Sequence, residues 1–209
     1  MNILSQLSSQ VGDITETANQ KVAAKCLKQP ALLKDIAKGL IDANQKLIGD
    51  TAEIMTIVAE QKPELIKPFA QQIIPLLDHK YTRARWEAAH SLSYLATYVP
   101  KEIGAILPKL KGIAILDDST IVRDYTTWTI ANYAQTSKTA AHAAVDALAI
   151  ILDQWKDKQA AKVIQGFIYA VKQDKTLLPK VQKLVKPYEK STKGVVKKVV
   201  KQFQTVIKK

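Results

Sequence analysis

The sequence predicts an all-α protein, a right-handed α-solenoid, on three observations. Ala, Leu, Ile, Val and Lys dominate its 209 residues, whereas aromatic residues make up only 6% and there are seven glycines. This composition favours helices over strands. The other two observations are a repeat of nearly constant length and, inside each repeat, two segments with helical spacing of apolar residues.

The repeat is marked by an apolar residue followed directly by an acidic one. Its five occurrences are spaced by 36, 39, 36 and 36 residues: Ile41-Asp42, Leu77-Asp78, Leu116-Asp117, Leu152-Asp153 and Tyr188-Glu189. Self-similarity at a period of 20 to 50 residues is typical of solenoids. We therefore take one unit to be about 37 residues long.

Each unit is expected to hold two helices joined by a polar turn. The segment before the acidic residue, as in IGAILPKLKGIAIL, carries apolar residues at spacings of three and four. The segment after it, as in VRDYTTWTIANYA, forms the second helix. The acidic residue lies in the turn, where its carboxylate can accept hydrogen bonds from free amides at the start of the second helix.

These units account for the whole chain as one predicted domain, residues 1–209. An N-terminal cap with one helix occupies residues 1–29, central repeats occupy 30–173, and a lysine-rich capping repeat occupies 174–209. Terminal repeats need a polar outer face. The five helical pairs are expected to begin near Pro30, Pro63, Pro100, Ser137 and Asp174.

The stretch LDDSTIVRDYTTWTIANYA, with Asp117 six residues before Arg123, resembles the HEAT repeats of armadillo-type solenoids. Asp78 and Arg85 form a second copy, with the arginine one residue later. The resemblance implies a ladder of bonds between neighbouring repeats, made by these four residues. It also implies five HEAT-like pairs whose second helices line a concave face. It says little about function, because such scaffolds serve many unrelated roles.

On this concave face we expect a groove that grips a protein or peptide. The predicted lining includes Trp86, His90, Asp124, Trp128 and Phe167, with Glu53 and Glu60 on the preceding unit. Exposed tryptophans on adjacent repeats would mark a binding surface, because aromatic side chains dominate binding energies. The alternative is that a shift of one residue in the helix register returns both tryptophans to the core.

The net charge of +12 belongs mostly to one end of the chain. Residues 172–209 carry twelve lysines against Asp174 and Glu189. The alternative function is therefore nucleic-acid binding without sequence preference, through contacts to phosphates. The residues predicted for it are Lys190, Lys193, Lys197, Lys198 and Lys201. A second interpretation is that these lysines only keep the last repeat soluble.

No motif points to catalysis, a cofactor or a metal. The three histidines are scattered, and none has the spacing of a metal site. One remote alternative remains: alkylpurine DNA glycosylases are built on HEAT-like repeats, and Trp86, Asp124 and Trp128 faintly resemble their tryptophans and aspartate.

The predicted function is a non-enzymatic scaffold, with a partner and an oligomeric state that the sequence does not name. A single cysteine, the absence of a signal peptide and the absence of a long apolar segment favour a cytoplasmic protein without a membrane span.

Overall fold

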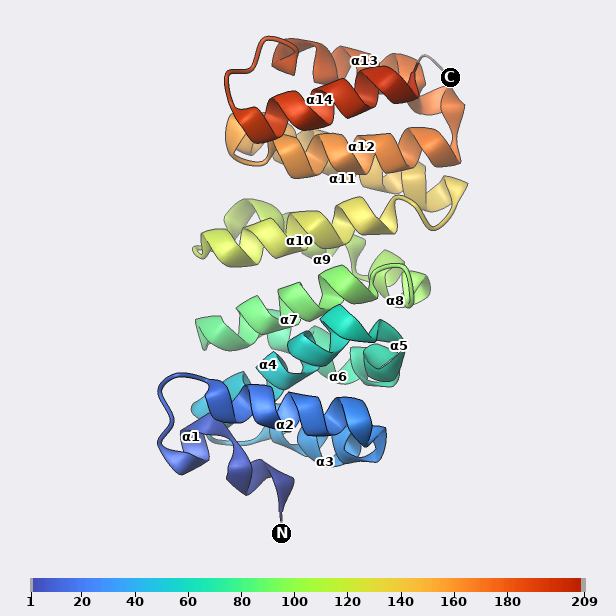
Figure 1. Ribbon diagram of the computed structural model, residues 1–209. Helices are drawn as coiled ribbons and strands as arrows, with labels where there is room; N and C mark the ends of the chain where they lie inside the picture. The colour runs from blue at the N-terminus through green and yellow to red at the C-terminus, as the bar shows by residue number, and fades with distance from the viewer. Residues whose placement is uncertain (1, 208–209) are drawn as a thin grey trace. The chain divides into compact units, whose positions relative to one another are not determined.

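The structure, a computed structural model, describes residues 2–207, and all regular structure within that range is helical (Figure 1). The chain forms two compact units, Met1–Val99 and Pro100–Lys209. Each is described by itself below. The helical pairs begin at residues 30, 63, 100, 138 and 175, within one residue of the positions expected from the repeat.

The first unit contains an N-terminal cap and two helical pairs. Its second helices, α2, α4 and α7, contact one another in chain order. Its elements are η1 (Ile3–Gln6), α1 (Ser8–Val11), α2 (Thr17–Lys28), η2 (Pro30–Leu32), α3 (Leu33–Lys38), η3 (Gly39–Ile41), α4 (Gln45–Gln61), α5 (Pro63–Ile66), η4 (Lys67–Phe69), α6 (Ala70–Ile73), η5 (Ile74–Asp78) and α7 (Thr82–Leu95), where η denotes a 3-10 helix.

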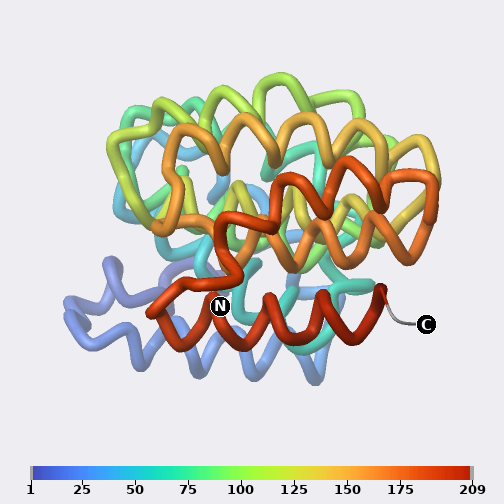
Figure 2. Tube along the Cα trace, turned by 90° about the horizontal axis from the view of Figure 1, so that it is seen from above, coloured from blue at the N-terminus to red at the C-terminus, as the bar shows by residue number. Residues whose placement is uncertain are grey.

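The second unit contains three helical pairs. In Figure 1 its second helices, α10, α12 and α14, lie in front, and its first helices lie behind them. Seen from above, α14 runs along the lower edge of the view and α13 lies above it (Figure 2). The elements are α8 (Pro100–Ala105), α9 (Leu107–Leu116), α10 (Thr120–Tyr133), α11 (Lys138–Trp155), η6 (Lys156–Lys158), α12 (Ala160–Gln173), η7 (Lys175–Leu177), α13 (Leu178–Val185), η8 (Lys186–Tyr188) and α14 (Gly194–Val206).

Prolines break most of the first helices, which were predicted to be continuous. Pro68 lies in η4 and Pro75 in η5, so the first helix of that pair is a series of short α and 3-10 segments. Pro108 opens α9 after a break at Ile106. A proline ring removes a backbone donor and clashes with the preceding turn. The first helix of the fourth pair, α11, has no proline and runs unbroken for 18 residues.

The polar turns between the paired helices show which residue in each repeat corresponds to Asp117. The Asp117 carboxylate accepts a hydrogen bond from the Ser119 amide (2.8 Å), and Asp42 accepts one from Asn44 (2.7 Å). In the turn between η5 and α7, His79 takes this position, and its Nδ1 accepts from the Tyr81 amide (3.1 Å). Asp78 is therefore one residue before the equivalent of Asp117, and it is His79 that precedes Arg85 by six residues, as Asp117 precedes Arg123.

The two arginines of the predicted ladder hold their own turns. Arg85 Nη1 donates to the carbonyls of His79 (3.0 Å) and Lys80 (3.3 Å). Arg123 Nη1 donates in the same way to the carbonyls of Asp117 and Asp118. Both arginines thus satisfy carbonyls that a helix end leaves free. The ladder between neighbouring repeats stays a prediction.

In the second unit, α10 and α12 approach so closely that only glycine fits at one position. A Cβ atom on Gly166 would lie 2.9 Å from the Cβ atom of Ala131 and 2.5 Å from the Leu148 side chain. This contact fixes which face of α12 points inward. No helix within the described range is long and apolar enough to cross a membrane.

Candidate partner-binding surface

The most distinctive surface feature of the second unit is a hollow of about 370 Å³ built by its three second helices, which we call the Trp128 hollow. Three consecutive repeats contribute to it, because α10 supplies Trp128 and α12 and α14 supply the remainder. The residues that line it are Trp128, Ala161, Lys162, Gln165, Val195, Lys198, Val199 and Gln202. Its lining therefore combines apolar side chains with two lysines and two amides.

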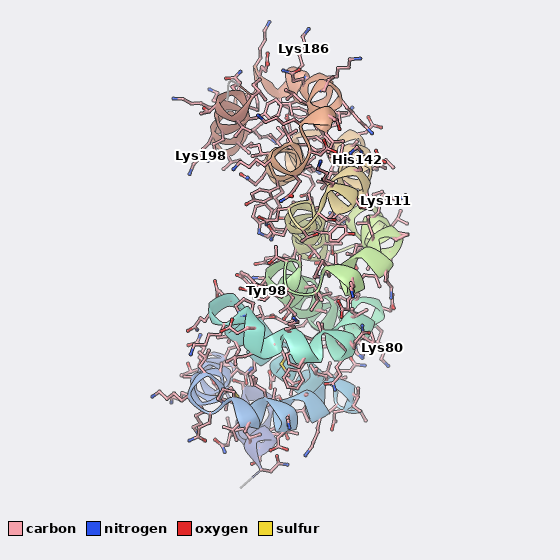
Figure 3. All side chains as sticks on the ribbon, turned by 90° about the vertical axis from the view of Figure 1, so that its right-hand side faces the viewer. Lys80, Tyr98, Lys111, His142, Lys186 and Lys198 are labelled. Atoms are coloured by element: carbon pink, nitrogen blue, oxygen red, sulfur yellow. The ribbon has the colours of Figure 1, made fainter. Side chains whose placement is uncertain are left out.

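The turn of α14 decides which of its lysines reach this hollow. Val196, Val199, Val200 and Phe203 are buried. These four residues form the buried stripe of α14. Successive residues of a helix are 100° apart, so Lys198 lies on the same flank of this stripe as Val195 and Gln202, which both line the hollow. The Lys197 and Lys201 positions fall on the opposite flank. Lys198 points outward on the side of the unit away from Lys111 and His142 (Figure 3).

Val195 supplies exposed apolar area at the edge of the Trp128 hollow. Its side chain is 68% exposed, unlike the valines that α14 buries. Trp128 itself is half-buried, with one part packed and one part open. A half-buried aromatic ring beside an exposed valine is an apolar contact area with no partner in the described chain.

Asp124 is held by two donors from the neighbouring repeat. Lys162 Nζ lies 2.9 Å from Asp124 Oδ2, and Gln159 Nε2 donates to Asp124 Oδ1 at 2.5 Å. Both carboxylate oxygens therefore accept hydrogen bonds within the protein. The predicted groove residue Asp124 thus fixes Lys162 at the edge of the Trp128 hollow.

A second hollow of about 320 Å³ lies around Trp155, which was not among the predicted site residues. The indole Nε1 donates to the Ala114 carbonyl at 2.9 Å. The Arg123 guanidinium lies 4.3 Å from the ring centroid, and Lys158 Nζ lies 5.7 Å from it. These distances are typical of cation–π contacts. Asp124 lines this hollow and contacts Lys162 in the next, so the two hollows adjoin.

The structure corrects the predicted position of Phe167. This side chain has no exposed area and belongs to the core. The exposed or half-buried positions of α12 include Ala161, Lys162 and Gln165, so the predicted register was wrong by one residue. The sequence contained a usable signal, because Lys162 and Lys172 mark the polar side of this helix.

Trp86 and His90 lie on α7 in the first unit and are half-buried. His90 Nε2 lies 3.2 Å from the Tyr94 hydroxyl. Burial lowers the pKa of His90 to about 4, against a smaller opposing effect of Glu60, so the ring is neutral at pH 7. A groove that joins Trp86 to Trp128 would span both units, and it stays a prediction.

Glu53, expected on the open face, is instead part of a buried charged cluster in the first unit. Arg83 is its centre and lies 2.8 Å from Glu53, 3.1 Å from Asp50 and 2.9 Å from Glu16. The Asn19 amide on α2 donates to Asp50 (3.0 Å) and Glu53 (2.6 Å) on α4. Side chains from three successive second helices are thus joined by hydrogen bonds.

The charges of this cluster perturb one another. Burial raises the pKa of Glu53 to about 7, although Asn19 and Arg83 act to lower it. Burial also raises the pKa of Glu87 to about 7, against a smaller lowering by the Thr56 hydroxyl. For Arg83, burial lowers the pKa, but the carboxylates of Glu53, Asp50 and Glu16 outweigh burial and raise it.

The lysines predicted for nucleic-acid contact are all exposed, but they do not form one site. Lys190 lies in the turn that precedes α14, and Lys193 directly precedes the helix. Lys197 and Lys201 lie on the flank of α14 opposite to Lys198. Only Lys198 lines the Trp128 hollow. The structure thus separates one lysine of the five from the others.

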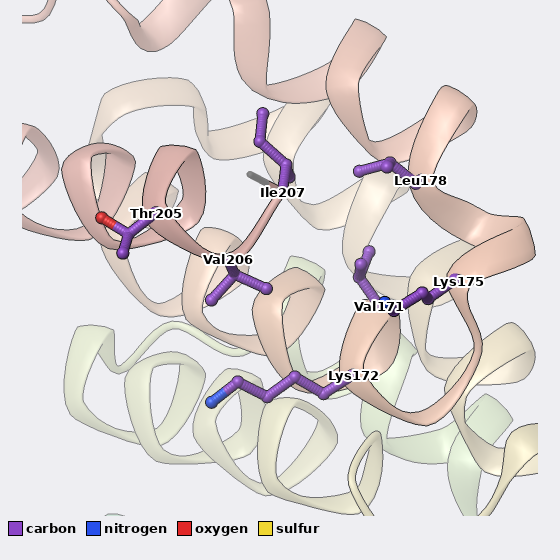
Figure 4. A pocket seen from close by; sticks show the side chains of 7 residues that line it. All are labelled: Val171, Lys172, Lys175, Leu178, Thr205, Val206 and Ile207. Carbon is purple, nitrogen blue, oxygen red and sulfur yellow. The ribbon is translucent and has the colours of Figure 1, made fainter. Parts of the chain in front are cut away.

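A further hollow, of about 340 Å³, lies near the end of α14 (Figure 4). Lys172, Lys175 and Ile207 are among its lining residues, and it contains no residue predicted for binding. Among residues 2–207, no group of three or more His, Cys, Asp or Glu side chains is placed to hold a metal ion.

The likeness to solved structures concerns the fold. A designed armadillo repeat protein in complex with the peptide (KR)4 matches with a TM-score of 0.74 and 18% identity, over 99% of this chain and 97% of the other. The fold is an armadillo-type α-solenoid. A computationally designed armadillo repeat protein for modular peptide recognition matches this armadillo-type chain with a TM-score of 0.69 and 17% identity, over 99% and 97% of the two chains.

An engineered protein is also similar to this armadillo-type chain, with a TM-score of 0.71 and 16% identity over 99% of this chain and 95% of the other. No protein-family model and no curated protein matches the sequence. At these identities the likeness shows the fold alone, and a function has to be argued from the surface.

Proposed function

We propose that this protein is a non-enzymatic scaffold that binds a peptide or protein segment along α10, α12 and α14, with Trp128 as the main contact. The observation that carries the proposal is the Trp128 hollow, in which a half-buried aromatic ring is flanked by polar side chains from two further repeats. Aromatic anchors in a pocket with a polar rim are the usual source of binding energy. The designed armadillo neighbours, which bind or were designed to recognise peptides, support the same class of partner.

The hollow suits a chain segment better than a small molecule. It is open, and it is shared among three parallel repeats that present equivalent positions of their second helices. Its volume of about 370 Å³ is near the lower end of small-molecule pockets. An extended segment crossing several second helices would instead contact both the Trp128 and the Trp155 hollows.

The proposal is tested with an unbiased peptide library displayed on phage and selected on the purified protein. Peptides that are enriched should bind the wild type, and Trp128→Ala should raise their Kd about tenfold or more, because the ring supplies most of the apolar contact. Leu116→Ala is the matched control: it removes a 79% exposed apolar side chain from α9, outside the hollow. Equal binding by wild type and Trp128→Ala would contradict the proposal.

The alternative function, sequence-independent nucleic-acid binding, draws on the exposed lysines of the last repeat. It predicts that substitutions of lysines on both flanks of α14 would weaken binding, because every lysine that contacts a phosphate would contribute. Trp128→Ala would leave such binding nearly unchanged. The same variants therefore distinguish the two functions.

A further inference from the structure

The charge around the Trp128 hollow identifies the chemistry of the partner. Two basic side chains, Lys162 and Lys198, line the hollow, and its lining contains no acidic side chain. Asp124 is already paired with Lys162 and Gln159. No carboxylate of the described chain lies within 4.0 Å of Lys198 Nζ, so its charge is free for a ligand.

We propose that the Trp128 hollow binds an acidic peptide segment, with a carboxylate between Lys162 and Lys198 and an apolar side chain on Trp128 and Val195. This inference rests on the proposed scaffold function and specifies its partner. The two lysines come from neighbouring repeats, α12 and α14, and both line the hollow. A carboxylate is the group that pairs with both ammonium groups and is common in peptides.

The apolar part of the lining requires more than a polyanion. Trp128, Ala161, Val195 and Val199 form a surface that phosphates or a run of carboxylates alone would leave in contact with water. The expected segment therefore alternates acidic residues with a leucine, valine or aromatic residue. This requirement separates the acidic peptide from nucleic acid that is bound through its phosphates alone, because phosphates carry no apolar side chain.

The amides of Gln165 and Gln202 complete the lining. One belongs to α12 and the other to α14, and neither makes a side-chain hydrogen bond to another described residue. Amide side chains offer donors and acceptors together, as the backbone of an extended peptide does. They are placed to bind main-chain groups while the lysines and the tryptophan bind side chains.

The charge is the reverse of what a basic peptide needs. The designed armadillo neighbour that matches with a TM-score of 0.74 is in complex with (KR)4, a peptide of lysine and arginine only. Lys162 and Lys198 would repel such a peptide from the Trp128 hollow. The same fold is thus expected to select the opposite charge.

The test measures fluorescence anisotropy of a labelled peptide built from glutamate and leucine, at about 0.15 M salt, where distant charges are screened. A peptide with glutamine in place of each glutamate and one with lysine serve as ligand controls. Binding of the glutamate peptide, with at least about tenfold weaker binding of the glutamine peptide, is the expected result. Equal binding of the two would overturn the acidic inference but leave the scaffold function standing.

A pair of adjacent lysines on one helix provides the matched variants. Lys198→Glu should raise the Kd by about threefold to tenfold, because its charge lies in the hollow. Lys197→Glu changes the net charge by the same amount on the opposite flank and should alter the Kd by less than about twofold. Lys162→Gln should weaken binding in the same direction as Lys198→Glu; glutamine avoids placing a second carboxylate next to Asp124. Helical content by circular dichroism checks that each variant folds.

Three further results would overturn the inference. Equal losses for Lys197→Glu and Lys198→Glu would show attraction by diffuse charge. A single-stranded oligonucleotide that binds more tightly than the glutamate peptide, with equal dependence on both lysines, would favour nucleic acid. If Trp128→Ala lost binding while Lys198→Glu and Lys162→Gln kept it, the hollow would still be the binding site, but its partner would not need to be acidic.

Discussion

The two units use charge in opposite ways, although both are built from the same kind of helical pair. In residues 1–99, eleven basic side chains nearly balance ten acidic ones, and the contacts between α2, α4 and α7 include buried charges around Arg83. In residues 100–209 there are twenty basic side chains against nine acidic ones, and α10 and α12 meet through Ala131 and Gly166 and through one partly exposed ion pair, Asp124–Lys162. In the first unit, buried charges hold neighbouring helices together. In the second unit, most charges lie on the surface, where a partner can reach them.

The largest effect is expected from removing the cation of the first unit. Arg83→Met leaves Asp50, Glu53 and Glu16 without their shared partner, and breaking a buried ion pair on one side typically costs about 3–5 kcal/mol. Urea unfolding followed by Trp86 fluorescence, with Trp128 and Trp155 replaced by phenylalanine, reports on this unit alone.

The control for that variant is an exposed ion pair of the same unit. Lys38 and Asp35 are 2.6 Å apart with side chains 73% and 50% exposed. Lys38→Met should change the free energy of unfolding by less than about 1 kcal/mol. If the two variants had similar effects, the buried cluster would not be what distinguishes the first unit.

A smaller loss is expected from the close helix contact of the second unit. Gly166→Ala places a methyl group 3.0 Å or less from Ala131 and Leu148, and such overpacking costs about 1–3 kcal/mol. Gly112→Ala is the matched change, because a Cβ atom there meets nothing within 4 Å and should stabilise α9 by about 0.5–1 kcal/mol. Thermal unfolding measures both, and a loss of stability in both variants would contradict the packing argument.

The pH dependence of stability also tests the buried charges of the first unit. The raised pKa of Glu87, about 7 against its ordinary 4.5, means that its contribution to stability is fully present below about pH 4.5. That contribution is lost as pH rises through 7. Glu87→Gln should therefore gain stability relative to wild type between pH 5 and pH 8.5, by at most about 3 kcal/mol.

The comparison with wild type at each pH is needed because His90 acts in the opposite direction. Its pKa is lowered to about 4, so it contributes stability above about pH 6.5 that is lost as pH falls. This contribution is common to wild type and to Glu87→Gln and cancels in their difference. A difference between the two proteins that stays constant with pH would show that Glu87 is not perturbed.

The repeat and its helical pairs were predictable because their signals are local. Prolines, apolar spacing and turn residues act within a few positions, and they fixed the starts of all five pairs. The armadillo-type fold followed from that regularity. What the local pattern missed were the breaks at Pro68 and Pro75 and the replacement of a turn aspartate by His79.

The candidate site was less predictable because burial depends on residues in other repeats. Glu53 was expected on the surface, but it is buried because Asn19 and Arg83, each 30 or more residues away, supply its hydrogen bonds. Phe167 was misplaced because the register of α12 depends on how Gly166 meets Ala131. Trp155 was not predicted as a site residue, because its contact with Arg123 joins two repeats and has no local signal in the sequence.

The proline breaks of the first helices also determine which of their backbone hydrogen bonds open first and so expose amides to hydrogen exchange. A series of short α and 3-10 segments such as α5 to η5 has fewer consecutive backbone hydrogen bonds than the unbroken α11. Amide hydrogens in residues 63–78 should therefore exchange with deuterated solvent faster than those in the middle of α11. The scaffold would then combine firm second helices, which carry the binding residues, with first helices that open in an order set by their prolines.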